Sequence, residues 1–159
     1  MHVPTRGRYS LRLMLEIARL GDAEAPASLA EIAAWTGISR RYLEQLVIPL
    51  RRAGLVKGRS GRAGGYCLAR DPAEITVGDI IAAARGPVSL VRCVDDEGAC
   101  ARSGGCECRL MWMLLTLGVR DVLDECTLAD LGDPGWRRRV AAVVAARRGR
   151  RAAGKRGRR

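Results

Sequence analysis

The sequence contains no phenylalanine, and all aromatic residues together make up 4% of its 159 residues. A core built from this chain must therefore be packed mainly from Leu, Ile, Val, Ala and Met side chains. Apolar runs fall short of the roughly 20 residues that span a bilayer, and the first residues do not resemble a secretory signal. We therefore expect a cytoplasmic protein without a membrane partner, and its length favours one domain with an accessory element.

Histidine is almost absent, since His2 is the only one in the chain. The six cysteines include no C-x-x-C pair, and no base accompanies a nucleophile in the sequence. These absences argue against thiol redox catalysis. We therefore expect a protein that is not an enzyme.

Positive charge is unevenly distributed, although the formal net charge is +11. Residues 137–159 hold ten Arg and one Lys without any acid, which leaves 17 basic and 17 acidic residues in 1–136. Affinity of the neutral body for nucleic acid must therefore come from locally clustered arginines. We expect the tail to be mostly disordered, with a helical turn or two. It would either hold nucleic acid nonspecifically or stay solvated.

Residues 33–66 have the order of a DNA-binding unit. A helix ends near the turn Thr36-Gly37-Ile38, and Ser39 can cap a second helix. Beyond Gly54, two short strands flank a Gly- and Arg-rich turn, so that a wing follows the helices. The second helix has one apolar face with residues at i, i+3, i+4 and i+7, namely Leu43, Leu46, Val47 and Leu50. We predict a mainly α fold: a winged helix-turn-helix with a two-stranded wing, whose second helix can enter a major groove.

The polar side of the second helix carries residues that can read bases. Arg bonds guanine edges and Gln bonds adenine edges in a bidentate way, and the N-terminal end of such a helix meets the bases. Wing arginines can enter a minor groove or hold phosphates. The alternative is ordinary solvated charge. Pro49 should kink the helix or shorten its hydrogen-bond ladder just before Leu50. The residues expected to contact DNA are Arg40, Arg41, Glu44 and Gln45 in the helix, and Lys57, Arg59 and Arg62 in the wing.

Capping residues predict the remaining helices of the body. We expect a first helix over 10–20, and Ser28 with Glu31 forms a capping box for a short second one. Thr76 and Thr127 are suited to cap two later helices.

The longest helix is predicted from Arg109 to about Cys126, roughly 18 residues and so about 27 Å long. Its first half is apolar on nearly all sides, which is too much for a helix packed on one side only. A second surface is implied, most simply the same helix of another copy. Burial inside a single core is the alternative, but the chain is small for that. We therefore expect a homodimer joined by this helix.

Four cysteines lie between positions 93 and 108, in a polar stretch without periodicity. In a reducing cytoplasm such clustering favours metal over disulfides. Thiolates are soft ligands that hold iron–sulfur clusters or zinc. We expect an irregular loop that binds an iron–sulfur cluster, with zinc or metal-free thiol chemistry as alternatives. The proposed ligands are Cys93, Cys100, Cys106 and Cys108, whereas Cys67 and Cys126 look like ordinary small apolar residues.

These features together resemble the IscR/NsrR/CymR-type family of bacterial regulators (the Rrf-two family). The resemblance rests on TRGRYSLRLMLEIA, SLAEIAAWTGIS, RYLEQLVIPLRRAGLVKGRSGRAGGYCLAR, ITVGDII, the clustered cysteines and LDECTLADL. It covers most of residues 5–131 and leaves out the tail.

The resemblance implies a homodimeric winged-helix transcription factor, usually a repressor, that binds a palindromic operator in double-stranded DNA. By motif position it adds Ser39 and Ser60 to the expected DNA contacts. Several members bind an iron–sulfur cluster through three cysteines, which correspond here to Cys93, Cys100 and Cys106. We expect the 2Fe-2S type, with 4Fe-4S as the alternative.

The resemblance leaves the fourth ligand of such a cluster open. IscR-like members place a His three residues after the third Cys, where this chain has Arg109; NsrR-like members use an N-terminal acid, where this chain has Arg8. Cys108 is the local substitute, and His2 and Glu107 are more remote options. Cluster-free members, which sense metabolites or partner proteins, provide the alternative interpretation.

The chain should thus divide into four parts: the winged helix-turn-helix domain over 1–86, a cysteine-rich cluster-binding loop over 87–108, a dimerisation helix with a short C-terminal helix over 109–136, and a basic tail over 137–159. Our hypothesis is a switch. Cluster loss, oxidation or attack by nitric oxide would reorder the loop beside the dimer helix and so shift the two reading helices.

Overall fold

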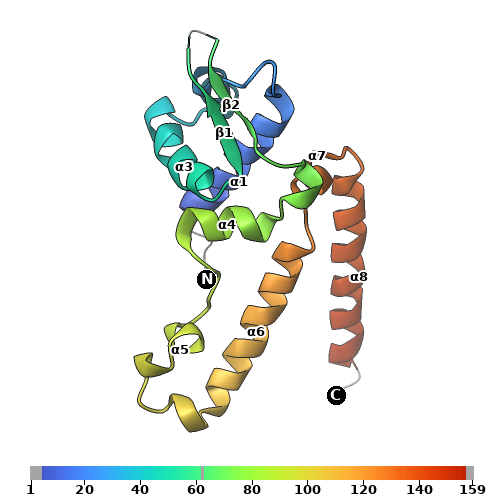
Figure 1. The fold of residues 1–159 in the computed structure, drawn as a ribbon. Helices are drawn as coiled ribbons and strands as arrows, with labels where there is room; N and C mark the ends of the chain where they lie inside the picture. Colours follow the sequence, from blue (N-terminus) through green and yellow to red (C-terminus); the bar gives the residue numbers. More distant parts are fainter. Residues whose placement is uncertain (1–4, 62, 157–159) are drawn as a thin grey trace.

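The structure, a computed structural model, describes residues 5–61 and 63–156 (Figure 1). A helical body surrounds two strands, and two long helices extend away from it (Figure 1). The elements are α1 (Thr5–Leu20), α2 (Leu29–Thr36), α3 (Arg40–Arg52), β1 (Val56–Arg59), β2 (Gly65–Leu68), α4 (Val77–Arg85), α5 (Arg92–Asp95), α6 (Glu107–Asp124), α7 (Leu128–Gly132) and α8 (Trp136–Arg156). The predicted mainly α fold with a two-stranded wing is confirmed.

The core forms where α1 packs against α3 and α4, and it is aliphatic as the composition predicted. Leu13, Met14 and Ile17 of α1 are fully buried. The predicted apolar face of α3 is buried too, so the opposite face of that helix is the exposed one. This packing fixes the orientation of α3 in the body.

One prediction about a helix boundary in the body was wrong. α1 begins at Thr5 rather than Ser10, because Gly7 and Ser10 are themselves buried against the body and the first turns pack inward. α3 runs through Pro49 to Arg52, and the kink expected there stays a prediction. Proline removes the hydrogen bond to the carbonyl of Gln45, an exposed residue whose carbonyl can bond water instead.

Three helices begin with a capping box, a pair of reciprocal hydrogen bonds. The side chain of the cap residue accepts from the backbone N–H three residues later, and the acid at that later position accepts from the backbone N–H of the cap. Each such cap is worth about 1 kcal/mol. The pairs are Ser28 with Glu31 for α2, Thr76 with Asp79 for α4 and Thr127 with Asp130 for α7. The predicted starts of these three helices are confirmed.

The wing is an antiparallel hairpin in which Val56 lies opposite Leu68. Ala27, which precedes α2, extends it, because Ala27 and Tyr66 exchange two backbone hydrogen bonds of 2.9 Å. A Cβ atom at Gly65 would lie 2.4 Å from the Ala27 carbonyl oxygen, so this close approach requires glycine. The hairpin was predicted, and its pairing with Ala27 was not.

The chain returns to the body after α6. Val77 donates to the carbonyl of Cys126 and Leu128 donates to that of Ile75, both at 2.8 Å. Leu128 is buried in the core, so the C-terminal end of α6 is held against the helical body. Within the described part of the chain, no helix is long and apolar enough to cross a membrane.

The tail was predicted to be mostly disordered, and this prediction was wrong. Residues 136–156 form α8, the longest helix among those described. The physical reason is that Ala and Arg have high helix propensity and dominate this segment, even though it has no continuous apolar face.

Candidate nucleic-acid interface and cysteine segment

The N-terminal end of α3 presents polar side chains to solvent. Ser39 caps the helix, and its hydroxyl accepts a hydrogen bond from the backbone N–H of Tyr42 at 3.4 Å. All five residues expected to read DNA from this helix are exposed, namely Ser39, Arg40, Arg41, Glu44 and Gln45. The arrangement is what a base-reading helix requires, and contact with DNA stays a prediction.

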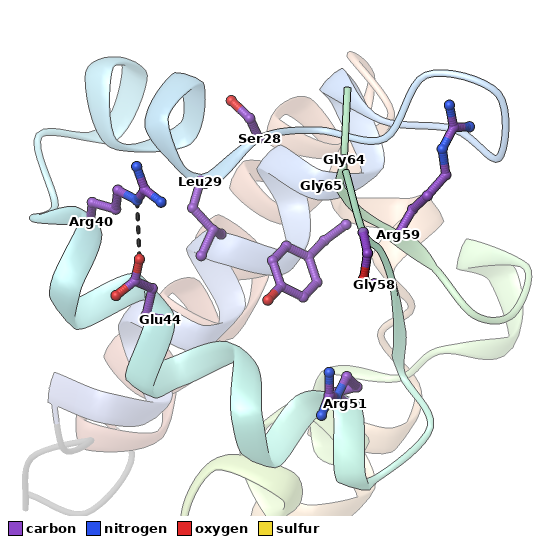
Figure 2. Close-up of a pocket in the computed structure, with 11 residues that line it drawn as sticks. Ser28, Leu29, Arg40, Glu44, Arg51, Gly58, Arg59, Gly64 and Gly65 are labelled. Atoms are coloured by element: carbon purple, nitrogen blue, oxygen red, sulfur yellow. Dashed lines mark hydrogen bonds and ion pairs between the residues drawn. The ribbon is translucent and has the colours of Figure 1, made fainter. Parts of the chain in front are cut away.

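One ion pair lies on this surface. Arg40 Nε donates to Glu44 Oε1 at 3.0 Å, with both side chains more than half exposed (Figure 2). An exposed pair at i, i+4 contributes only about 0.3–0.5 kcal/mol. Both side chains can therefore exchange this contact for a contact with DNA at little cost.

The wing residues do not all face the same way. Lys57 and Ser60 are exposed. Arg59 instead reaches away from α3, and its Nη1 donates to the carbonyl of Glu24 at 2.9 Å, in the loop between α1 and α2 (Figure 2). Arg59 thus braces that loop in this structure. The remaining predicted wing residue, Arg62, lies outside the described residues.

An open hollow of about 260 Å³ separates α3 from the wing (Figure 2). Its walls include Arg40, Arg51 and the backbone of three glycines, Gly58, Gly64 and Gly65. Glycine lets an approaching backbone come close. The lining holds three arginines, Arg59 being the third, and one acid, Glu44, so its net positive charge would favour an anionic backbone. A DNA phosphate chain has these properties.

The cysteine segment, residues 87–108, was predicted to be an irregular loop, and it contains short ordered turns between irregular stretches. These turns are α5, two single 3-10 turns (Glu97–Ala99 and Ser103–Gly105) and the first residues of α6. α6 starts two residues earlier than predicted, so Cys106 is its N-cap and Cys108 lies in its first turn. Local turns closed by hydrogen bonds, such as Asp96 N–H to Arg92 carbonyl, account for the difference.

The structure does not bring the four predicted ligands together. Cys100 and Cys108 are exposed, Cys93 and Cys106 are half-buried, and all four are free thiols. Among residues 5–61 and 63–156, no three His, Cys, Asp or Glu side chains are grouped so that they could hold a metal ion. The cluster therefore stays a prediction.

Two arginines of α6 hold the cysteine segment, and sequence reasoning missed this role. Arg109 Nε donates to the Cys93 carbonyl and its Nη2 to Glu97, both at 2.7 Å. Arg120 Nε donates to the Val88 carbonyl at 2.8 Å and its Nη2 to Asp95 at 2.9 Å. The helical spacing of the two arginines was the available signal.

The thiol donors fit an iron–sulfur cluster by their chemistry, because clusters are held by soft thiolates. Their present positions do not fit one. The position at which IscR-like members have a ligand His holds Arg109, a cation, and its guanidinium is bonded to the backbone of Cys93. A cluster thus requires this segment to change conformation.

Large apolar side chains on α6 are exposed in the single chain. Contiguous apolar surface of this kind marks interaction sites. These residues are Leu110, Met111, Trp112, Leu114, Leu115, Leu117 and Val122. The apolar face for which a second surface was predicted is therefore exposed, and the homodimer stays a prediction.

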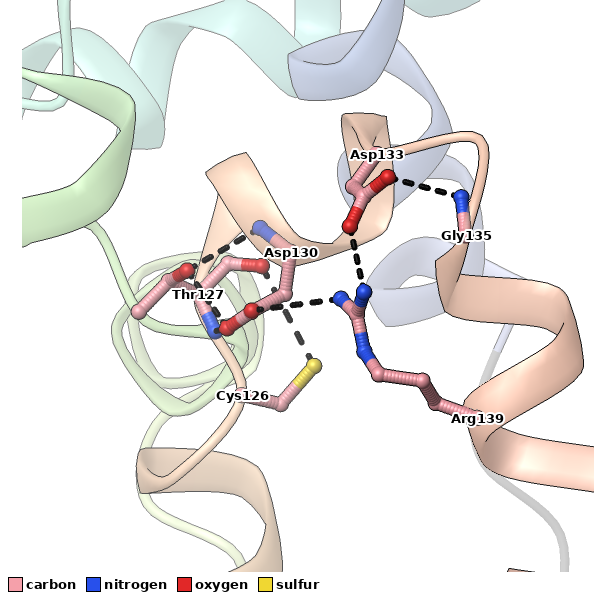
Figure 3. A network of polar contacts seen from close by, with 6 residues as sticks. All are labelled: Cys126, Thr127, Asp130, Asp133, Gly135 and Arg139. Atoms are coloured by element: carbon pink, nitrogen blue, oxygen red, sulfur yellow. Dashed lines mark hydrogen bonds and ion pairs between the residues drawn. The ribbon is translucent and has the colours of Figure 1, made fainter. Parts of the chain in front are cut away.

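A polar network joins α7 to α8 (Figure 3). Asp130 accepts from the Thr127 hydroxyl at 2.7 Å and from its backbone N–H at 3.0 Å, and these bonds lower the pKa of Asp130. Arg139 bonds Asp133 and lies 3.9 Å from Asp130. Burial, and then the charge of Asp130, raises the pKa of Cys126.

This chain has a winged helix-turn-helix whose second helix exposes polar side chains, and this is the fold of a class of DNA-binding regulators. The chain belongs to the Rrf2 family, whose model, described as "Iron-dependent Transcriptional regulator", matches residues 3–134. It is thus a DNA-binding transcriptional regulator of the CymR/IscR type, and α8 lies beyond the match.

Individual relatives agree with this assignment. The chain is 44% identical over 131 residues to the HTH-type transcriptional regulator CymR of Bacillus subtilis, covering 82% of this chain and 89% of that protein. It is 40% identical over 131 residues to IscR of Serratia proteamaculans, with coverage of 82% and 79%. The solved structure of CymR, titled the global cysteine regulator of B. subtilis, matches with a TM-score of 0.68 at 42% identity, covering 83% and 96% of the two chains. T. potens IscR matches with a TM-score of 0.66 at 37% identity, covering 82% and 85%.

Proposed function

We propose that this protein is a homodimeric repressor that binds a palindromic operator through α3 and the wing, and that its cysteine segment senses iron–sulfur status, redox state or nitric oxide. The observation that carries the proposal is the place of the cysteine segment. Arg109 and Arg120 bind it to one face of α6, and other faces of α6 expose apolar side chains to a partner. A change in the segment would therefore act directly on the dimer helix.

The exposed residues of α6 support a dimer. Leu110 and Leu114 are about two-thirds exposed in the single chain. Burying such side chains yields about 25 cal/mol for each Å² removed from water. Pairing α6 with its copy would supply that burial and set two α3 helices at a fixed spacing, as a palindromic operator demands.

The sensory part rests on the thiols and on the iron-dependent description of the family. Cys93, Cys100 and Cys106 would hold the cluster, with Cys108 as the fourth donor. When bound, the cluster would supply a redox-active group that oxygen and nitric oxide attack. The chain itself has to release the Cys93 backbone from Arg109 so that these thiols can share one site.

Purification without oxygen, followed by an absorbance spectrum and assays of iron and sulfide, tests this proposal. We expect a brown protein, and Cys106→Ala should abolish the visible absorbance and alter operator affinity. Cys67→Ala, in β2 and outside the segment, is the matched control and should change neither. A colourless protein with bound zinc, or a Cys106→Ala variant that keeps both properties, would overturn the cluster assignment.

A cluster-free regulator is the second candidate function, and three observations favour it. Arg109 closes the segment without metal. Beside α5 lies an open hollow of about 370 Å³ lined by Arg85, Arg92, Asp95 and others, whose charges of both signs suit a small zwitterion. A structural relative is titled a cysteine regulator. L-cysteine, but not L-alanine, would then raise the Tm of iron-free protein, and Arg92→Ala would remove that shift.

A further inference from the structure

Arg109 and Arg120 lie on the same face of α6. They are eleven residues apart, which is about three helical turns and about 16 Å along the helix axis. Both reach the first half of the cysteine segment, residues 88–97, and Figure 1 shows α5 of this segment beside α6. The two side chains can therefore fasten one stretch of chain at two points.

Each arginine makes the same pair of contacts, one to a backbone carbonyl and one to a carboxylate. Arg120 donates to the Val88 carbonyl and to Asp95, and Arg109 donates to the Cys93 carbonyl and to Glu97. The planar fork of guanidinium suits two acceptors at once, which lysine cannot match.

Arg109 is the more buried of the two arginines. Its side chain is 13% exposed, against 34% for that of Arg120. A largely buried guanidinium without acceptors is costly. Opening the segment therefore requires Arg109 to find new partners or water.

We propose that Arg109 and Arg120 form a clamp that keeps residues 88–97 docked on α6 and keeps Cys93 out of a shared thiolate site until the segment opens. The inference rests on the proposed function, because it takes the cysteine segment to be the sensor. It assigns Arg109, at the position where IscR-like members have a ligand, the opposite role: it stabilises the metal-free form. Opening of the clamp breaks the bonds that two arginines of α6 make to the segment, and so the state of the segment acts on the dimer helix.

The clamp is tested by hydrogen exchange on the full-length, iron-free chain. Backbone N–H groups of Val94, Asp96 and Ala99 are hydrogen-bonded within the segment and report its opening. Arg109→Leu should speed their exchange by roughly tenfold or more, since it removes two hydrogen bonds to a charged group. Arg102→Leu, an exposed arginine of the same segment, is the control and should leave the rates unchanged.

Glu97→Gln provides a milder variant that keeps the fold intact even if Arg109→Leu does not. Because it weakens one exposed ion pair, the expected acceleration is about twofold to fivefold. Labelling of the half-buried Cys93 by a thiol reagent, read by mass spectrometry, should accelerate in parallel. Labelling of the exposed Cys100 should not change in either variant.

Operator affinity shows whether the clamp regulates or only stabilises. In iron-free protein, Arg109→Leu should shift affinity in the same direction as anaerobic loading of the normal chain with iron and sulfide. If Arg109→Leu showed the same rates of hydrogen exchange and Cys93 labelling as Arg102→Leu, the clamp would be refuted and the proposed function would be unaffected. If Arg109→Leu exchanged faster but loading with iron and sulfide did not change operator affinity, the proposed function would be refuted. The docking of the segment on α6 would then be established, but it would have no regulatory role.

Discussion

Arginine side chains have at least three different roles in this molecule. Arg40 makes a weak, exposed pair with Glu44 that DNA can displace. Arg59 braces the loop before α2 through the Glu24 carbonyl. Arg109 is largely buried and holds the cysteine segment. The sequence pattern indicated that Arg40 and Arg59 were exposed, but their partners, and that of Arg109, depended on the fold.

Gly65 provides a prediction at the scale of a single residue. A methyl group there would lie 2.4 Å from the Ala27 carbonyl oxygen, in the backbone pairing that joins the wing to the segment before α2. Gly65→Ala should therefore lower the free energy of unfolding by about 1–3 kcal/mol, measured by urea denaturation. Gly132→Ala, where no atom lies within 4 Å of the new Cβ, is the control. Equal stability of the two variants would show that the wing is not packed as described.

Helices with strong local signals were predicted well from the sequence. Each of these signals involves residues only a few positions apart in the chain, so it can be recognised without the fold. They are the caps at Ser28, Thr76 and Thr127 and the apolar period of α3. The exposure of the α3 reading residues followed from the same period.

Features that depend on distant partners could not be predicted. Arg59 bonds a residue 35 positions away, and Arg109 bonds one 16 positions away. The turns of the cysteine segment are closed by local hydrogen bonds and show no periodicity, so the segment looked like a loop. α8 was missed because its helix propensity comes without an amphipathic pattern.

The junction of α7 and α8 should be sensitive to acid. Hydrogen bonds from Thr127 are the main cause of the lowered pKa of Asp130, whose ordinary value is 3.8. A carboxyl group with a depressed pKa contributes stability above its unfolded pKa and loses it as pH falls through the folded value. The urea midpoint should therefore fall between pH 5 and pH 2.5, and it should fall less in Asp130→Ala. Identical acid profiles would contradict the network in Figure 3.

The whole molecule combines a neutral body with a basic terminal helix. All of the net charge of +11 is accounted for by residues 137–159. Charge of this kind raises affinity for any DNA and makes it salt-dependent without reading sequence. Truncation after Trp136 should therefore lower affinity for operator and random duplex alike and flatten the dependence of log affinity on log salt. A loss of preference for the operator would instead place sequence recognition in α8.

Assembly is the second property at this scale. Leu114→Glu would place a charge on the exposed apolar part of α6, where a partner helix would bury it. We expect this variant to be monomeric by analytical ultracentrifugation and to lose operator binding. Leu20→Glu, which alters an exposed leucine at the end of α1, should remain dimeric. A Leu114→Glu variant that stays dimeric would mean that α6 does not join the copies.

Selection of binding sites from a random duplex library by the full-length protein tests the central claim, that two copies of α3 read DNA together. The account predicts enrichment of inverted half-sites whose centres lie about 10 base pairs, one helical turn, apart or a multiple of that. Gln45→Ala should relax the preference at one fixed position in each half-site. Failure to enrich any sequence, or enrichment of a site that Gln45→Ala and Arg41→Ala leave unchanged, would contradict it.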